Sequence, residues 1–200
     1  MLLKRNYFFR ALSFFSPMLN QLINVFWTIV SFAAVGFYWG VYITEKGSRW
    51  TLYVIIILSI LFSIIPGKWL SALRLSSNRK TYERIGVRIV LWFVQNGTFV
   101  NRIQRKSASQ KGLITNRRSA LVYLKTIDMQ ERYHYCCFVF FTLSAFSALS
   151  FAKTEFALFI SLSNIIYNVY PILVQQYNRL RINSVISRST TSNDFVPNKL

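Results

Sequence analysis

The chain has 200 residues, of which 53% are hydrophobic, 17% aromatic and only 15% charged, with 24 Lys and Arg against 6 Asp and Glu. Globular chains carry about 25% charged residues on average, so a net charge of +18 must be concentrated in a few segments. The hydrophobicity excludes an intrinsically disordered chain, and a nucleic-acid binder would spread its basic residues over a water-soluble surface. The composition therefore predicts a membrane protein that does not bind nucleic acid.

The first uncharged run extends from Ala11 to Thr44, and its most hydrophobic part predicts a transmembrane helix over 22–43. A helix needs about 20 apolar residues to cross the hydrocarbon core of a bilayer. The run is longer than the hydrophobic region of a secretory signal and ends on aromatic residues, so we expect a retained membrane anchor. A second uncharged run predicts a transmembrane helix over 50–67.

Two further uncharged runs, Tyr135 to Ala152 and Phe156 to Asn178, lie close together near the end of the sequence. Only Lys153, Thr154 and Glu155 separate them. So short a polar link requires the chain to turn back at once, which predicts an antiparallel helical hairpin over 133–178.

The distribution of positive charge predicts the orientation in the membrane, because short loops rich in Lys and Arg stay in the cytoplasm. The arm before the first helix, the segment 68–132 and the tail after the hairpin together hold 21 of the 24 basic residues. The expected fold is therefore an all-α, multi-pass membrane protein with about four transmembrane helices and cytoplasmic termini. Its regions are a membrane part (1–67), a basic cytoplasmic or interfacial segment (68–132), the hairpin (133–178) and a cytoplasmic tail (179–200).

The segment 68–132 is where a cytoplasmic activity would reside. The stretch Ile89 to Asn101 is uncharged but too short to span a bilayer, which favours an interfacial position. Basic residues follow it from Arg102 to Arg118. One interpretation is attraction to anionic lipid headgroups, and the other is binding of an anionic substrate such as a coenzyme A phosphate.

One histidine and two cysteines exclude much metal-dependent membrane chemistry. Histidine-rich di-iron sites and His-Glu-x-x-His zinc sites cannot be built from a single histidine, so no metal is expected. That histidine, His134, stands three residues after Glu131, which places both on one helical face. A carboxylate partner orients an imidazole and raises its basicity, as a general base requires. The alternatives are anchoring of the helix end and a structural ion pair with Arg132.

A second polar constellation lies in the fourth apolar run. Asn168 and Gln175 are seven residues apart and share a helical face, with Pro171 between them. Pro171 frees a backbone carbonyl near position 167 and is expected to distort the helix. Asn168 either stabilises the helix bundle by hydrogen bonding or acts in the site. Arg179 and Arg181 follow where the helix leaves the membrane, either reaching lipid phosphates or binding a substrate anion.

The sequence Asn-Val-Tyr-Pro-Ile-Leu-Val-Gln-Gln-Tyr-Asn-Arg-Leu-Arg over 168–181 resembles the closing Asn-x-Pro-x-x-x-x-Gln-Arg-Tyr-Asn-Arg-x-Arg signature of the glycosyl-4,4'-diaponeurosporenoate acyltransferase family. Glu131-x-x-His134-Tyr135 is similar to the family's Ala-Glu-x-x-His-Trp. Val87-Arg88, with Gly97 ten residues after Val87, is similar to its Val-Arg-x-Trp-x-x-x-x-x-Asp-Gly stretch, and Tyr82-Glu83 precedes it at the expected place. The resemblance covers roughly residues 80 to 182.

The sequence departs from the family pattern at several positions. Asn96 stands where the family often has Asp, Gln130 replaces an Ala, and Gln176 replaces the first Arg of Gln-Arg-Tyr-Asn-Arg. The stretch 89–94 is apolar where relatives are basic. No acidic role is therefore expected at position 96.

The resemblance implies a small membrane acyltransferase of the bacterial cell membrane that attaches a fatty acyl chain to the sugar of a glycosylated carotenoid. Its partners would be the lipid bilayer, acyl-CoA as co-substrate and a glycosylated lipid acceptor, with no further cofactor. His134 would act as general base with Glu131 orienting it, and Asn168 or Asn178 would donate to the oxyanion. Arg88, Arg179 and Arg181 would hold phosphates, and the residues that match the closing motif would contact substrate: Gln175, Tyr177, Asn178, Arg179 and Arg181.

Two other classes of function remain open from the sequence. A non-catalytic membrane subunit would use the helix faces and the basic segment for assembly alone. A small interfacial methyltransferase would bind a nucleotide-like cofactor through the same arginines.

Overall fold

The computed structural model of the chain describes residues 2–45, 47–93 and 117–193. Every regular element in these ranges is helical, which confirms the predicted all-α fold. The long helices are α1 (Leu2–Thr44), α2 (Arg49–Ser63), α7 (Arg117–Ser150), α8 (Thr154–Asn164) and α9 (Tyr170–Asn193). A five-residue π-helical turn, η1 (Ile165–Val169), joins α8 to α9 without a break. The short helices are α3 (Gly67–Ala72), α4 (Arg79–Arg84) and α5 (Val87–Phe93).

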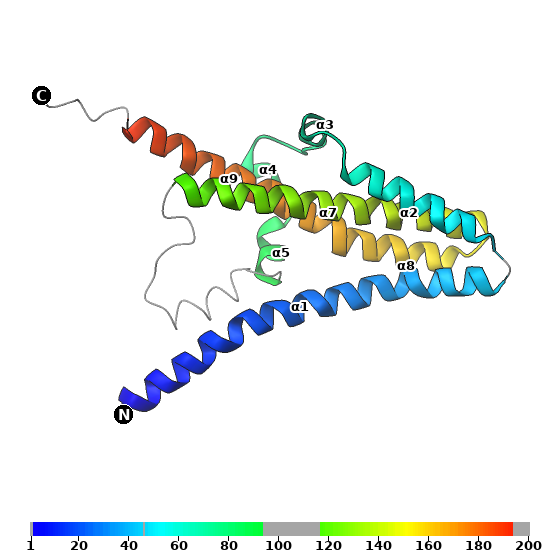
Figure 1. The fold of residues 1–200 in the computed structure, drawn as a ribbon, viewed down its shortest axis with the longest axis horizontal. Helices are drawn as coiled ribbons and strands as arrows, with labels where there is room; N and C mark the ends of the chain where they lie inside the picture. Colours follow the sequence, from blue (N-terminus) through cyan, green and yellow to red (C-terminus); the bar gives the residue numbers. More distant parts are fainter. Residues whose placement is uncertain (1, 46, 94–116, 194–200) are drawn as a thin grey trace, which may run out of the picture.

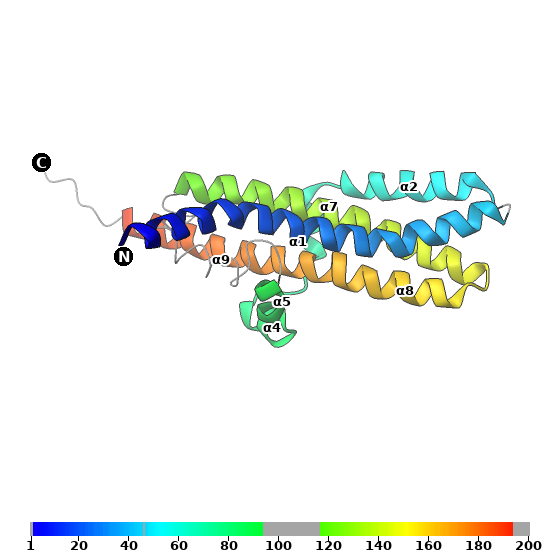
Figure 2. The same ribbon diagram turned by 90° about the horizontal axis from the view of Figure 1, so that it is seen from below.

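The long helices lie side by side, and the two tight links between them, α1 to α2 and α7 to α8, meet at one end of the molecule (Figure 1). The N-terminus, α4, α5 and the end of α9 lie toward the other end, and α3 lies near the middle of the molecule. Figure 2 shows α4 and α5 outside the layer of long helices, against α9. The expected interfacial stretch 89–101 is described only as far as Phe93, and Asn96, Gly97 and the basic residues Arg102 to Lys111 lie outside the described residues.

Three helices in the described part of the chain are long and apolar enough to cross a membrane, namely Asn24–Thr44, Arg118–Ser150 and Thr154–Ser184. The second predicted crossing is a shorter apolar helix, because α2 ends at Ser63 after 15 residues, about 22 Å. Pro66 is the N-cap of α3, and a proline at this position does not extend α2. Arg132 donates to the carbonyl oxygens of Ser63 (2.8 Å) and Ile65 (2.7 Å), which satisfies acceptors that the end of α2 exposes.

The hairpin of α7 and α8 turns through Phe151, Ala152 and Lys153, and Ala152 adopts a left-handed φ of 55°. Both arms are longer than the sequence indicated, since α7 begins at Arg117 and α9 continues to Asn193. Apolar side chains explain the extension. Ala120 and Ile127 pack against Ile182 in a buried cluster, so these charged stretches still present an apolar face to each other.

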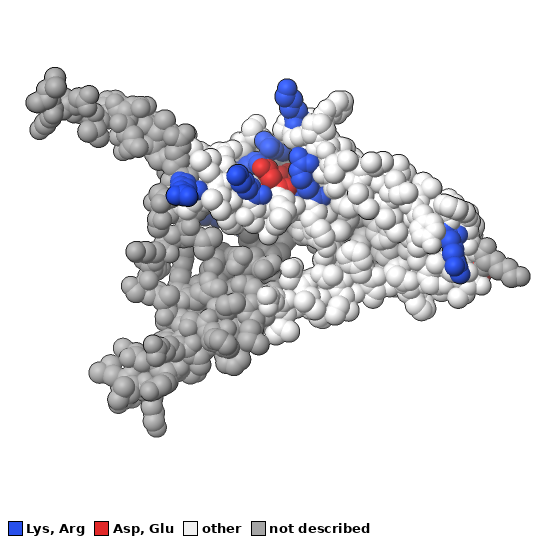
Figure 3. All heavy atoms as spheres, in the orientation of Figure 1, with Lys and Arg blue, Asp and Glu red and all other residues white. Residues whose placement is uncertain are grey.

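The largest core lies between α1, α7 and α8, toward the end with the tight links. Tyr38 and Trp39 are buried there, and their polar atoms bond to the hydroxyls of Ser147 (2.6 Å) and Ser144 (3.1 Å). On the face shown in Figure 3, basic side chains surround acidic ones over the crossing of α7 and α9, and an uncharged band separates them from the tip. This pattern is typical of a protein that spans a bilayer.

Candidate active site

Polar side chains that the sequence singled out meet between α7 and the returning helix of α8, η1 and α9. On α7, Asp128, Glu131 and His134 follow one another at intervals of three residues and so share a face. Asn168 contacts this face at His134, and Arg179 contacts it at Glu131. The site therefore consists of two networks, one neutral and one charged.

The neutral network is a chain of amides that ends on the only histidine. Nδ1 of His134 lies 3.5 Å from Oδ1 of Asn168, whose side chain is fully buried. Nδ2 of Asn168 donates to Oδ1 of Asn164 (2.8 Å). Asn164 in turn donates to the carbonyl oxygen of Phe138 (3.2 Å) and to Oγ1 of Thr142 (2.9 Å). Each donor along the chain fixes the orientation of the next amide.

This order of donors and acceptors favours the tautomer of His134 that holds its proton on Nδ1. Both donors of the Asn164 amide are used, so its oxygen must accept from Asn168. Asn168 then turns its own oxygen toward Nδ1 of His134, which can only donate to it. A neutral imidazole that holds its proton on Nδ1 keeps a lone pair on Nε2, the arrangement that a general base needs.

The π-helical turn places Asn168 in this chain. Pro171 has no backbone N–H, so the carbonyl of Tyr167 lacks its α-helical donor, as the sequence predicted. The structure widens the helix at this point into η1, and both Tyr167 and Asn168 are buried there. Single π-helical turns occur frequently at functional sites because they redirect side chains from the regular helical faces.

Tyrosine rings form the walls around the imidazole. The hydroxyls of Tyr133 and Tyr167 lie 2.9 Å apart, and Thr28 of α1 lies 2.9 Å from the hydroxyl of Tyr167. Both rings meet His134 edge to face, with centroids at 5.2 and 5.7 Å. These contacts join α1 to the site, and they could not be predicted from the sequence because tyrosines are common throughout the chain.

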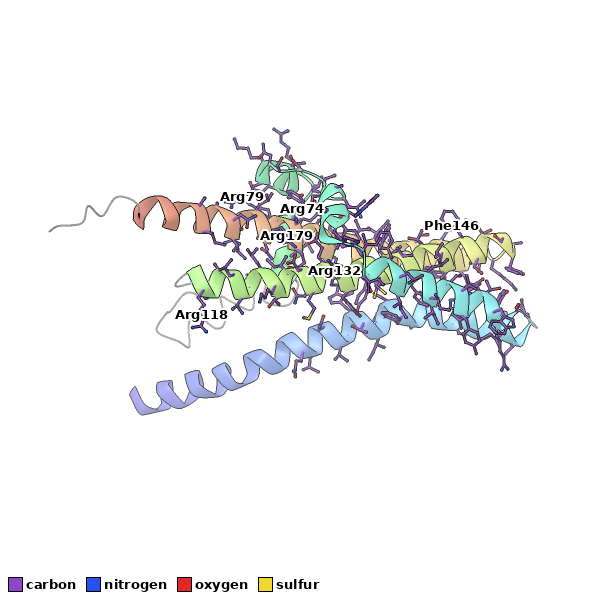
Figure 4. All side chains as sticks on the ribbon, turned by 45° about the horizontal axis from the view of Figure 1, so that its top comes forward. Arg74, Arg79, Arg118, Arg132, Phe146 and Arg179 are labelled. Atoms are coloured by element: carbon purple, nitrogen blue, oxygen red, sulfur yellow. The ribbon has the colours of Figure 1, made fainter. Side chains whose placement is uncertain are left out.

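The charged network is centred on Arg179. Its guanidinium donates to Oε2 of Glu131 (2.6 Å) and to Oδ1 of Asp128 (2.5 Å). Glu131 is 3% exposed and Arg179 8% exposed. In Figure 4, Arg179 lies with Arg74 and Arg79 where the segment before α4 passes over α9, whereas Arg118 lies apart at the start of α7. The sequence did not identify Asp128 as a member of the site.

Two expectations from the sequence are corrected by this network. Glu131 does not orient His134, because its carboxylate is bound by Arg179 and Asn168 takes the place beside the imidazole. Arg179 does not present its charge to a phosphate, because two carboxylates bind it. The physical reason is that a buried carboxylate gains more from a charge-assisted bond to a guanidinium than from a neutral imidazole one turn away.

The two asparagines expected to donate to the oxyanion, Asn168 and Asn178, lie in different surroundings. The amide nitrogen of Asn168 already donates to Asn164. Asn178 is half-buried and lies ten residues beyond Asn168, about 15 Å along the helix and so too far from His134. Three buried side-chain atoms between the helices have no hydrogen-bond partner among the described residues: Oε1 of Glu131, Oε1 of Gln175 and Nε of Arg179.

Gln176 holds the segment before α4 onto α9. Its Oε1 accepts from the backbone N–H of Leu75 (3.1 Å) and lies 3.0 Å from the hydroxyl of Tyr82, and its Nε2 donates to the hydroxyl of Tyr135 (3.1 Å). Tyr82 is fully buried, and this burial raises the pKa of its phenol. Where the family has Arg, the glutamine of this chain therefore makes buried polar contacts.

The remaining predicted binding residues surround Tyr177, away from His134. The hydroxyl of Tyr177 donates to Oε1 of Glu83 (3.1 Å), which also pairs with Arg88 (2.9 Å). The guanidinium groups of Arg79 and Arg181 lie 5.5 and 5.9 Å from the centroid of the Tyr177 ring. Arg79 was missed from the sequence because no spacing rule connects it to α9.

Comparison with known proteins identifies the family of the chain. A family model described as glycosyl-4,4'-diaponeurosporenoate acyltransferase matches residues 66–188, which is more than half of the chain. No curated protein and no solved structure gives a significant match. The matched range contains both networks apart from Thr28, and it includes the surroundings of Tyr177. The chain therefore belongs to the glycosyl-4,4'-diaponeurosporenoate acyltransferase family.

Proposed function

We propose that this acyltransferase moves a fatty acyl chain from acyl-CoA to a sugar hydroxyl of a glycosylated carotenoid or a related glycolipid. Membership of the family supports acyl transfer in the modification of carotenoid glycosides. The single observation that carries the proposal is the chain from Asn164 through Asn168 to His134, because it leaves Nε2 of the imidazole as a proton acceptor.

The reaction follows from that acceptor. Nε2 of His134 takes the proton of the sugar hydroxyl as the hydroxyl oxygen attacks the thioester carbonyl. A C–O bond forms, the C–S bond breaks, and the electron pair leaves with the sulfur of coenzyme A. The proton on the imidazole then passes to this thiolate, which returns His134 to its neutral form. Asn168 stabilises the transient imidazolium through Nδ1, and such base catalysis contributes about 10² to 10⁴ in rate.

The depth of His134 suits two substrates of opposite solubility. The imidazole lies sixteen residues before the end of α7, about 24 Å along the helix, compared with a hydrocarbon thickness of about 30 Å. His134 is thus near the boundary between hydrocarbon and headgroups, three residues after Glu131 of the charged network. A lipid-linked sugar reaches it from the bilayer and acyl-CoA reaches it from water.

The distribution of charge supports a cytoplasmic position for this end. The tight links at the opposite end contain few basic residues, and the segments around the site contain most of them. We therefore infer a multi-pass protein of the bacterial cell membrane with both termini in the cytoplasm, where acyl-CoA is made. The expectation that no metal or further cofactor is needed is part of the same proposal.

The proposal is tested by acyl transfer in lipid nanodiscs that contain the purified protein and radiolabelled palmitoyl-CoA. The acceptors are a glycosylated carotenoid, a glycosyl diacylglycerol and the carotenoid without its sugar. We expect labelled product only with acceptors that bear a sugar, and no product when labelled S-adenosylmethionine replaces the acyl donor. Transfer to the sugar-free carotenoid, methyl transfer, or a lack of acyl transfer to every acceptor would contradict the proposal.

A further inference from the structure

Two guanidinium groups from different helices converge on one tyrosine ring. Arg79 belongs to α4 and Arg181 to α9, and both have their ζ carbons within 6 Å of the centroid of the Tyr177 ring. The ring is only 4% exposed, whereas both arginines are exposed. Arg79 also donates a long hydrogen bond to the hydroxyl of Tyr177 (3.5 Å). Tyr177 therefore positions two cations whose outer faces meet solvent.

The charge of these arginines is not neutralised by the protein. The carboxylate of Glu83, which contacts the hydroxyl of Tyr177, is paired with Arg88. Within the residues that the structure describes, neither Arg79 nor Arg181 forms an ion pair with a carboxylate. Arg179, two residues after Tyr177, differs from both because two carboxylates bind it. The surface at Tyr177 thus keeps an excess of positive charge.

The position of α4 against α9 is fixed by hydrogen bonds rather than by the arginines themselves. Gln176 binds Leu75 and Tyr82, and the hydroxyl of Tyr82 donates to the carbonyl oxygen of Ser76 (2.8 Å). The side chain of Asn78 caps the start of α4 (2.9 Å). The two guanidinium groups are therefore held ready for a ligand, which lowers the entropy lost on binding.

We propose that Arg79 and Arg181 bind the phosphate groups of the acyl-CoA donor beside Tyr177, an inference that rests on the proposed function. Guanidinium groups bind phosphate through paired, charge-assisted hydrogen bonds. Tyr177 lies nine residues beyond Asn168, about 14 Å along the helix. The long pantetheine arm of coenzyme A connects phosphates at Tyr177 to a thioester at His134. In a phospholipid the phosphate is only a few bonds from the acyl ester, so that ester would not reach the imidazole.

Kinetics with two acyl donors test this assignment. The donors are palmitoyl-CoA and S-palmitoyl-N-acetylcysteamine, which has the same thioester but no phosphate. For Arg79→Ala and Arg181→Ala we expect the KM for palmitoyl-CoA to rise about tenfold to a hundredfold, as for the loss of a charged hydrogen bond. The KM for the phosphate-free donor and the kcat for both donors should stay near their native values. The matched control is Arg84→Ala, an exposed arginine of α4 with no ion pair among the described residues.

Equal changes in KM for the two donors, or no change for either, would overturn the assignment. The same assays in nanodiscs of neutral and of anionic lipid identify the source of the phosphate. If the substitutions raise the KM for palmitoyl-CoA in both lipids, the phosphate belongs to the acyl donor, as proposed. If they raise it only in anionic lipid, lipid headgroups occupy the site and the assignment is overturned.

Direct binding of coenzyme A separates this inference from the proposed function. Calorimetric titration of the native protein and of the Arg79→Ala and Arg181→Ala variants requires no turnover. Weaker binding by the variants supports the phosphate site even if acyl transfer fails. Unchanged binding overturns the phosphate site even if acyl transfer is observed.

Discussion

The guanidinium of Arg179 on α9 donates to the carboxylate of Glu131 on α7 at 2.6 Å, and both side chains are more than nine-tenths buried. The neighbouring Asp128 gives the arginine a second carboxylate at the water-facing edge of the pair. Because α7 holds the base and η1, which continues into α9, holds its partner amide, this ion pair fixes the helices on which the site depends.

Removing one member of this pair should destabilise the fold. Arg179→Ala leaves a buried carboxylate without its cation, and breaking a buried pair in this way costs about 3–5 kcal/mol. Replacing both partners, as in Glu131→Leu with Arg179→Met, removes the isolated charge and should recover most of that loss. Thermal unfolding of the single and double variants in one detergent measures the difference. A single variant as stable as the native protein would show that the pair is not structurally required.

The adjacent residues Gln175 and Gln176 should respond oppositely to the same change. Gln176→Leu removes the partners of Leu75, Tyr82 and Tyr135, and unsatisfied buried groups cost about 1–3 kcal/mol. Gln175→Leu removes a buried carbonyl oxygen that has no partner, so its stability should be unchanged or higher.

The rate of limited proteolysis between Arg74 and Thr81 compares the two variants, because Gln176 holds that segment on α9. Cleavage should accelerate in Gln176→Leu and stay at the native rate in Gln175→Leu. Equal rates in the two variants would contradict the role given to Gln176.

Pro171→Ala should reduce acyl transfer without unfolding the protein. Alanine restores a backbone N–H, so the π-helical turn can relax to a regular helix. That relaxation rotates Asn168 away from His134 and should lower kcat at least tenfold. Ile165→Ala is the control, since this side chain lies in the same turn but is 47% exposed. A Pro171→Ala variant with native kcat would show that the widened turn is not needed.

The two ends of the helix bundle should lie on opposite sides of the membrane. A single cysteine introduced by Lys153→Cys marks the tight link after α7, and one introduced by Arg118→Cys marks the start of α7, both after Cys136 and Cys137 are replaced by Ser. A membrane-impermeant maleimide added to intact cells should label position 153 and leave position 118 unlabelled. Labelling of position 118 alone would reverse the proposed orientation.

The sequence predicted the long apolar helices because an uncharged run of membrane length satisfies its backbone hydrogen bonds in a bilayer by forming an α-helix. It did not predict the start of α7 at Arg117, because the stretch before Arg132 is charged and is held as a helix by contacts of Ala120 and Ile127 with Ile182. Pro171 predicted a distorted helix, and the structure contains the π-helical turn η1 just before this proline.

The sequence predicted several residues of the site, but it did not predict which of them contact each other. Helical spacing brings Glu131 and His134 to one face, yet it does not say which side chain of η1 or α9 faces each of them. Arg179 and Asn168 decide that, and they come from a segment more than thirty residues away. The Tyr167 hydroxyl and its partner Thr28 had no signal at all, since helix-to-helix contacts of this kind depend on packing.

The most direct test of the account is the rate of acyl transfer by His134→Ala, Asn168→Ala and the double variant, at matched amounts of folded protein in nanodiscs. The account predicts that His134→Ala lowers kcat by 10² or more and that Asn168→Ala lowers it in the native background but adds nothing in the His134→Ala background, since Asn168 acts through the imidazole. Asn183→Ala, an exposed asparagine of α9, should retain native activity. Full activity of His134→Ala, or independent effects of the two substitutions, would contradict it.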